Sequence, residues 1–173
     1  MLAAMPKVML LMAGEADTPT LDHAVRTLSD FGVDCRVEQV ADDRRLDLPE
    51  LAADWEAQGA RVFIVAAGAA TDLPAAVADS TLLPVLAVPV ESGELSGVDL
   101  LLAAMKMPEG EDYLTLAVGR AGAVNAALYA VAILSESDRA LRERLKAFRA
   151  AQAEKVVAES LPQVAPGPNA VIE

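Results

Sequence analysis

Apolar runs of strand length alternate with helical patterns along the chain. The runs fall at residues 7–12, 34–40, 61–66, 84–90 and 113–118. The central runs are almost entirely apolar, which is typical of strands that are covered by helices on both faces. The pattern therefore predicts five parallel strands.

Helix start and stop signals separate the predicted strands. The first helix is predicted to begin at Asp17 or Thr18, either of which can cap it, with Pro19 in the first turn, and to stop at Phe31-Gly32. Further helices are predicted at about 47–58, from residue 71 or 72, from residue 96 or 97, and after residue 119. This alternation with short links predicts right-handed crossovers and a flavodoxin-like three-layer α/β/α sandwich.

The segment 135–160 is predicted to form one long charged helix. Leu141, Leu145, Phe148 and Val156 make an apolar stripe along it, wider than a solvated helix needs and narrower than a core helix shows. We therefore expect this helix to pack on another subunit. Residues 159–173 are rich in proline and are predicted to be a mobile tail, which leaves 1–158 as a single α/β domain with a C-terminal assembly helix.

Composition supports a layered architecture and excludes some partners. The chain of 173 residues is 54% hydrophobic but only 3% aromatic, so its core must be built from small aliphatic side chains that let helices approach a sheet closely. The formal net charge of −12 argues against nucleic-acid binding, because phosphates require clustered Lys and Arg.

Cysteine content and hydropathy bear on the compartment. The single cysteine, Cys35, can form neither an internal disulfide nor a zinc cluster. No stretch reaches the roughly 18 consecutive apolar residues of a membrane span. We expect a soluble cytoplasmic protein without a membrane partner.

The loops that follow the strands are the place to look for chemistry, because doubly wound sheets bind ligands beyond the carboxyl ends of their strands. The turn GAATD at 68–72 follows the third predicted strand. Asp72 in this turn either caps the helix that begins near residue 73 or presents a carboxylate to a ligand. Asp42 and Asp43, beside two arginines, form a solvated turn, a proton-transfer site or a pair of metal ligands. Close carboxylates can share a proton, which would raise one pKa of the pair.

Two motifs in the second half of the chain are more specific. VPVESGELSGVDLLLAAMKMPEG at 88–110 is followed by LAVGRAGAVNAALYAVAIL at 116–134. Together they closely resemble the catalytic domain of the phosphoribosylaminoimidazole carboxylase (PurE) family, whose members carry VPV, a small-residue loop, LxGxDxLLS, MPxG and AxGxAGAxNAALLAxxIL. The likeness covers roughly residues 7–150.

This resemblance implies both an assembly and an activity. Family members have a flavodoxin-like fold and form octamers in which the last helix reaches neighbouring subunits. Bacterial members rearrange 5-(carboxyamino)imidazole ribonucleotide into 4-carboxy-5-aminoimidazole ribonucleotide in purine biosynthesis, and relatives carboxylate the aminoimidazole directly with carbon dioxide. The resemblance implies no metal and no organic cofactor. It does imply a proton carrier, which in the family is a histidine in a Ser-Ala-His-Arg loop after the second strand.

The chain departs from the family motifs at its site loops. The first family loop, Gly-Ser-x-Ser-Asp, reads AGEAD at 13–17 and keeps only the carboxylate of Asp17. The histidine and arginine of the second loop align with Asp42 and Asp43 without a gap, or with Asp43 and Arg44 if one residue is inserted. Asp72 takes the place of a second family histidine, in a Gly-Gly-Ala-Ala-His-Leu-Pro turn.

These departures change the expected chemistry. An aspartate has an unperturbed pKa of about 3.9, against about 6.5 for histidine, so it can donate a proton at neutral pH only if burial or a neighbouring acid raises its pKa. The added acids Glu15, Asp42, Asp43 and Asp72 also predict weak binding of a phosphate monoester.

Two hypotheses follow. The first is a divergent carboxylase or mutase in which Asp17 orients the ribose, Arg44 meets the phosphate and an aspartate replaces the imidazole. The second is a non-catalytic oligomeric binding or scaffold protein that kept the fold and lost the site. The candidate catalytic residues are Asp42, Asp43 and Asp72, and the candidate substrate-binding residues are Gly14, Asp17, Arg44, Gly68, Ala69, Ser92, Gly93, Met107 and Pro108.

Overall fold

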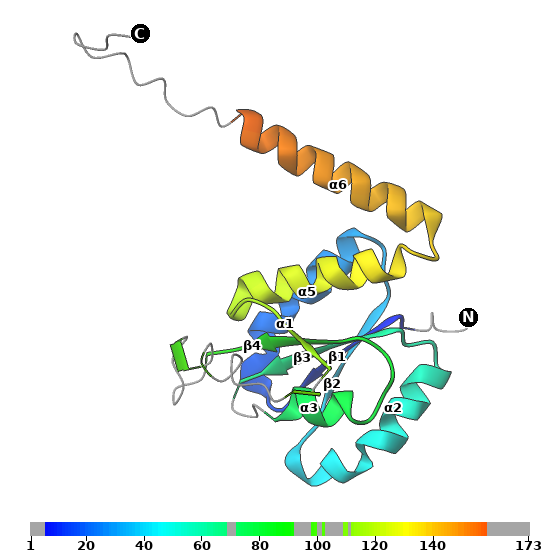
Figure 1. Ribbon diagram of the computed structural model, residues 1–173, viewed down its shortest axis with the longest axis vertical. Coiled ribbons are helices and arrows are strands. Elements are labelled where there is room, and N and C mark those ends of the chain that lie inside the picture. Colours follow the sequence, from blue (N-terminus) through cyan, green and yellow to red (C-terminus); the bar gives the residue numbers. More distant parts are fainter. Residues whose placement is uncertain are drawn as a thin grey trace, which may run out of the picture.

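The computed structural model describes residues 6–68, 72–91, 98–99, 102, 109–110 and 112–158. A parallel sheet of five strands, in the order β2-β1-β3-β4-β5, lies at its centre (Figure 1). The strands are β1 (Val8–Met12), β2 (Cys35–Gln39), β3 (Val62–Ala67), β4 (Val85–Pro89) and β5 (Leu114–Thr115). The flavodoxin-like fold predicted from the sequence is confirmed, although β5 is shorter than the predicted run 113–118.

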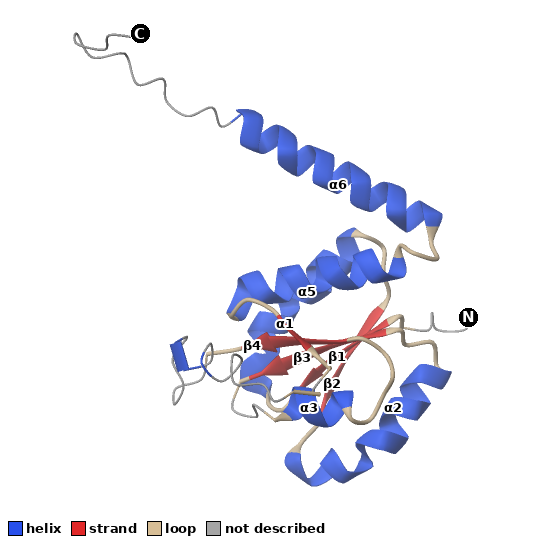
Figure 2. Ribbon diagram, viewed as in Figure 1, coloured by secondary structure: helices blue, strands red, loops and turns tan. Residues whose placement is uncertain are grey.

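Helices cover both faces of the sheet (Figure 2). Helices α1 (Thr18–Asp30) and α5 (Gly119–Leu134) pack on one face, and α2 (Leu48–Ala57) and α3 (Leu73–Ala78) pack on the other. The helix predicted from residue 96 or 97 lies mostly outside the described residues, of which Val98, Asp99 and Leu102 are helical.

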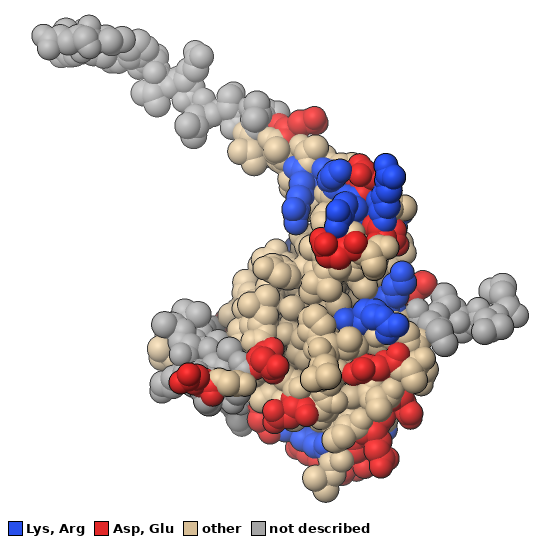
Figure 3. Space-filling view, turned by 45° about the vertical axis from the view of Figure 1, so that its right-hand side comes forward, with Lys and Arg blue, Asp and Glu red and all other residues tan. Residues whose placement is uncertain are grey.

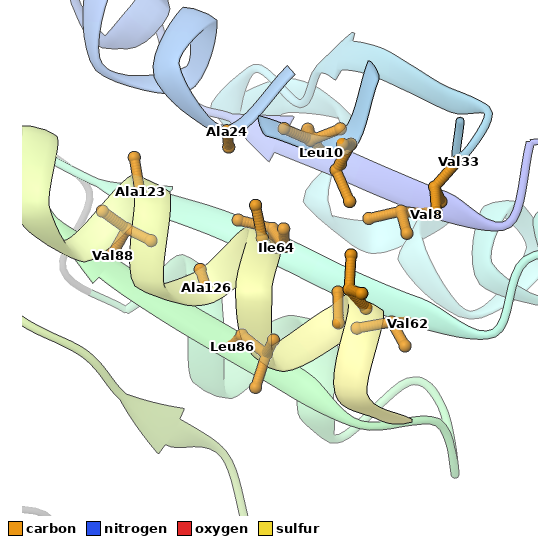
Figure 4. Close-up of a cluster of buried hydrophobic side chains, with 14 of the residues drawn as sticks. Val8, Leu10, Ala24, Val33, Val62, Ile64, Leu86, Val88, Ala123 and Ala126 are labelled. Atoms are coloured by element: carbon orange, nitrogen blue, oxygen red, sulfur yellow. The ribbon is translucent and has the colours of Figure 1, made fainter. Parts of the chain in front are cut away.

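Strand residues alternate between the two layers of core. Val8 and Leu10 of β1 face the α1/α5 layer, whereas Met9 and Leu11 face the α2/α3 layer, and β3 alternates in the same way. Small side chains on the helices, such as Ala24 of α1 and the alanines of α5, point at this surface (Figure 4). The core is therefore built from small aliphatic residues, as the composition predicted.

The last helix, α6 (Arg139–Ala158), begins later than predicted. A turn occupies residues 135–138, and the Asp138 carboxylate accepts a hydrogen bond from the Leu141 N–H at 3.0 Å, which lowers the pKa of Asp138. Leu141 and Leu145 are buried in the α1/α5 layer, and the ring of Phe148 packs edge-on against Phe31, with 5.4 Å between the ring centroids. The first half of the predicted apolar stripe therefore packs against the core of its own chain rather than on another subunit.

The second half of α6 leads away from the sheet (Figure 1). Val156 is 73% exposed there. Residues 159–173, predicted to be a mobile tail, lie outside the described residues, so the domain boundary at 158 stays a prediction. Within the described ranges, no helix combines the length and apolar character that crossing a membrane demands.

Candidate functional site

The carboxyl ends of β1 and β3 lie side by side and lead to opposite faces of the sheet. β1 continues through a short 3₁₀ helix, η1 (Glu15–Asp17), to α1 on one face, whereas β3 leads to α3 on the other. Flavodoxin-like sheets bind ligands at this point of divergence. Gly14, Asp17 and Gly68, all predicted to bind substrate, follow these two strands.

Asp17 is one of the few polar residues buried in the described part of the chain, with only 5% of its surface exposed. Burial raises the pKa of Asp17 above its ordinary value of 3.8, and hydrogen bonds from the backbone N–H groups of Ala13 and Gly14 partly oppose this shift. Because the folded pKa is raised, the stability that this group contributes is complete below pH 3.8 and is lost as the pH rises through the folded pKa. Ionised Asp17 therefore costs stability at neutral pH.

Gly68 packs directly on the carboxylate of Asp17. A Cβ atom added to Gly68 would lie 2.4 Å from Oδ1 of Asp17 and 3.3 Å from its Cγ. A side chain at this position would force the Asp17 carboxylate or the strand end to shift, whereas glycine lets the loop after β3 approach the loop after β1 this closely. This contact joins the loops that follow β1 and β3.

A second group of charges links the loop after β2 to the start of α3. Arg45 belongs to the 3₁₀ helix η2 (Asp42–Asp47), and its Nη2 lies 3.1 Å from Oδ1 of Asp42. Its Nη1 forms an ion pair and hydrogen bond with Oδ2 of Asp72. One guanidinium thus joins two of the three predicted catalytic aspartates.

The predicted caps at Asp17 and Asp72 are wrong in one respect. Each aspartate occupies the N-cap position of its helix, but neither side chain makes a capping hydrogen bond. The Asp17 carboxylate turns inward to the N–H groups of its own loop, and the Asp72 carboxylate turns to Arg45. In both cases a partner outside the helix competes successfully with the helix terminus.

Asp43 and Arg44 are exposed and form no ion pair with other described residues. No side-chain hydrogen bond joins Asp42 to Asp43 among the described residues, which favours the solvated-turn interpretation for Asp43. The sequence reasoning missed Arg45 as a site residue. Its signal was the spacing of three residues from Asp42, which places opposite charges together on one side of a helical turn.

Five predicted binding residues lie outside the described residues, and their roles stay predictions: Ala69, Ser92, Gly93, Met107 and Pro108. Across the part of the chain that is described, no three His, Cys, Asp or Glu side chains are grouped so as to hold a metal ion. Cys35 begins β2 and pairs with Val8, at the amino ends of the strands, and burial together with the nearby charge of Asp34 raises the pKa of its thiol.

Comparison with protein families identifies the chain. The sequence model of the family described as AIR carboxylase matches residues 7–155. The chain belongs to this family. Among curated relatives, an N5-carboxyaminoimidazole ribonucleotide mutase from Pseudomonas aeruginosa is 44% identical over 149 residues, which cover 86% of this chain and 91% of the relative. The mutase of the same name from Brucella melitensis is 45% identical over 150 residues, with 86% and 93% covered.

Solved structures agree with this assignment at the level of the fold. The crystal structure of Treponema denticola PurE superposes with a TM-score of 0.76 and covers 88% of this chain and 95% of its own. Its sequence identity of 22% supports the shared fold alone. The family resemblance inferred from the motifs at 88–110 and 116–134 is confirmed.

Proposed function

We propose that this AIR carboxylase family member transfers a carboxyl group on an aminoimidazole ribonucleotide in purine biosynthesis, as a mutase or a carboxylase. The observation that carries the proposal is the family match from residue 7 to 155, which includes the buried Asp17 and the Gly68 that packs on it. Curated relatives that are named N5-carboxyaminoimidazole ribonucleotide mutase support the same substrate class.

The reaction requires a group that can accept and return a proton. Moving the carboxyl group from the exocyclic nitrogen to the ring carbon breaks one N–C bond and forms one C–C bond, while the ring carbon loses a proton and the nitrogen gains one. A carrier whose pKa lies nearer to neutral serves both directions best. The sequence offers Asp42, Asp43 and Asp72 for this role.

Asp17 is the better carrier among the described carboxyls, since burial raises its pKa. Asp42 and Asp72 are 88% and 72% exposed and are ion-paired with Arg45. We therefore place Asp17 at the proton-transfer position and leave Asp42 and Asp72 as groups that shape the charge of the site.

The remaining candidates fit substrate binding. Gly14 and Gly68 bring the backbone close to the ligand position, and Arg44 offers an exposed guanidinium that can bind a phosphate group. Ala69, Ser92, Gly93, Met107 and Pro108 complete the proposed binding set by resemblance to the family. No step of the proposal needs a metal or an organic cofactor.

A second candidate function is ligand binding without catalysis. The observation that favours it is the position of the single histidine, His23, which lies within α1 and away from the loops after the strands. A chain that lost both family histidines could keep the pocket and the assembly surfaces while losing turnover.

Direct assay separates the two candidates. The purified full chain is incubated with 5-(carboxyamino)imidazole ribonucleotide, or with aminoimidazole ribonucleotide and bicarbonate, and the 4-carboxy product is followed by chromatography. Turnover that Asp17→Asn abolishes and Asp43→Asn preserves supports the proposed carboxyl transfer. Tight binding of the product without turnover supports the second candidate, and neither binding nor turnover refutes both.

We further propose a cytoplasmic homo-oligomer, an octamer by resemblance to the family. Helix α6 carries six basic and two acidic residues, a formal charge of +4, whereas the rest of the chain carries eight basic and 24 acidic residues, a charge of −16. Figure 3 shows Lys and Arg gathered on α6 and Asp and Glu on the body below it. These opposite charges favour contact between α6 of one copy and the acidic remainder of another copy.

The middle of α6, at Arg149, also borders an apolar groove of about 500 Å³ that a second copy can fill. Light scattering after size exclusion, at low and high salt, tests this assembly. A monomer at every protein concentration would refute it. The groove is lined by Leu116, Asn125, Leu128, Tyr129, Ala132 and Arg149.

A further inference from the structure

Arg45 and its two partners, Asp42 and Asp72, form a bridge whose members differ in solvent exposure. The side chain of Arg45 is only 19% exposed, whereas its partners Asp42 and Asp72 are 88% and 72% exposed. The Arg45 Nε is buried and finds no acceptor among the described residues. The two carboxylates therefore hold the guanidinium from the solvent side.

The bridge spans the carboxyl end of β1. Arg45 and Asp42 follow β2, Asp72 follows β3, and these two strands lie on either side of β1. A guanidinium can present two nitrogens to two separate carboxylates, which the single ammonium of a lysine does less well. The geometry accounts for an arginine at this position.

Stability alone does not account for the bridge. Both carboxylates are well exposed, and ion pairs of this kind contribute little to folding because solvent and salt screen them. The bridge does change the charge that a ligand meets. Without Arg45, the carboxylates of Asp42 and Asp72 lose the cation that opposes them, and the adjacent residue Asp43 is an exposed acid as well.

We propose that Arg45 is a specificity-determining residue which cancels the charge of Asp42 and Asp72, so that the site accepts a ligand that bears a phosphate group. This inference rests on the proposed function, because it concerns the same site. Arg45 acts through the two carboxylates rather than by touching the ligand. The acidic residues that the sequence predicts around the site are then compatible with binding of a nucleotide.

Calorimetric titration of the full chain tests this role. The probes are 4-carboxy-5-aminoimidazole ribonucleotide and its phosphate-free nucleoside, each measured at low and high salt. We expect Arg45→Gln to weaken nucleotide binding by roughly three- to tenfold at low salt, to leave nucleoside binding unchanged, and to lose most of its effect at high salt. Arg45→Lys keeps the charge but engages the two carboxylates less well, so its nucleotide affinity should lie between those of wild type and Arg45→Gln.

A charge-cancelling variant distinguishes electrostatics from structure. The triple variant Asp42→Asn/Arg45→Gln/Asp72→Asn removes the cation together with the carboxylates that it opposes, so nucleotide affinity should return to at least the wild-type value. Arg26→Gln, on an exposed position of α1, makes the same change in net charge away from the site and should have no effect.

Other results would refute either the role of Arg45 or the proposed substrate class. Equal loss of nucleotide and nucleoside binding in Arg45→Gln, or no recovery in the triple variant, shows that Arg45 is structural or contacts the ligand itself. Unchanged nucleotide binding in Arg45→Gln refutes its role while the proposed function stands. A wild-type protein that binds neither probe refutes the proposed substrate class, and the role of Arg45 with it.

Discussion

The contact between Gly68 and Asp17 predicts a specific cost for one added methyl group. In Gly68→Ala, the new Cβ would lie 2.4 Å from Oδ1 of Asp17, whereas carbon and a heavy-atom neighbour prefer about 3.5 Å. Roughly 1 Å of movement is therefore required. Either the carboxylate moves or the end of β3 moves.

Both ways of relieving the clash are unfavourable. If the carboxylate moves, it loses favourable interactions with the backbone N–H groups of Ala13 and Gly14. If the strand end moves, overpacking costs about 1–3 kcal/mol. Replacing glycine by alanine also restricts the unfolded chain, which returns about 0.4–1 kcal/mol. The net destabilisation should be about 1–2 kcal/mol.

Gly14→Ala is the matched control. Gly14 belongs to the same site, but its backbone is extended, with φ −148° and ψ 165°, and a Cβ there would meet nothing within 4 Å. This variant should gain the unfolded-state benefit of about 0.4–1 kcal/mol without a clash. The two alanine variants are thus expected to shift stability in opposite directions.

Thermal unfolding at a single protein concentration measures the difference, because assembly would make the melting temperature concentration-dependent. For a chain of this size, 1 kcal/mol corresponds to about 2–4 °C, so Gly68→Ala should melt roughly 2–8 °C below wild type. In an Asp17→Ala background the same change should be harmless, a coupling of about 1–3 kcal/mol. A Gly68→Ala protein as stable as Gly14→Ala, or a cost that persists without Asp17, would refute the reasoning.

Three further predictions concern single side chains. Asp17→Asn should be at least as stable as wild type at pH 7, because the raised pKa of Asp17 makes its ionisation unfavourable in the fold, and this advantage should shrink as the pH falls toward 3.8. Denaturant titrations at several pH values measure the difference. A variant that is less stable than wild type at pH 7 would contradict the prediction. Asp72→Asn should lower stability by no more than about 1 kcal/mol, since the ion pair is well exposed and no capping bond is lost; a larger loss by the same titration would show that the bridge is structural. Leu141→Ala should lower the free energy of unfolding by about 2–5 kcal/mol because Leu141 is buried, whereas Val156→Ala should change it by no more than about 0.5 kcal/mol because Val156 is exposed. Melting experiments on the unassembled chain measure both variants. Equal effects would mean that α6 does not pack on the core of its own chain.

The sequence predicted the strands well where both faces are buried. The apolar runs at 61–66 and 84–90 became β3 and β4 within one residue, because continuous burial leaves little freedom of placement. The run at 113–118 predicted the bounds of β5 less well. Its strand pairs with β4 only at Leu114 and Thr115, and Leu114 is 42% exposed, so little burial determines where the pairing ends.

Side-chain partners in the site were harder to predict than the elements that carry them. An aspartate just before a Thr-Pro or Leu-Pro helix start has the sequence signal of a cap, and both Asp17 and Asp72 do occupy that position. Their actual partners depend on tertiary structure. Arg45 lies 27 residues from Asp72 in the sequence, and no local rule joins them.

The buried carboxyl of Asp17 changes how the missing histidines bear on function. An aspartate lacks the near-neutral pKa of an imidazole, but its pKa rises when water is excluded and when another negative charge comes near. Burial already raises the pKa of Asp17, and Gly68, which has no side chain, packs against its carboxylate. A carboxylate-bearing ligand seated there would contribute both effects at once, so the group would become a stronger base when the substrate is bound. If the chain has the proposed activity, loss of the imidazole shifts proton transfer toward a carboxyl whose strength depends on the ligand.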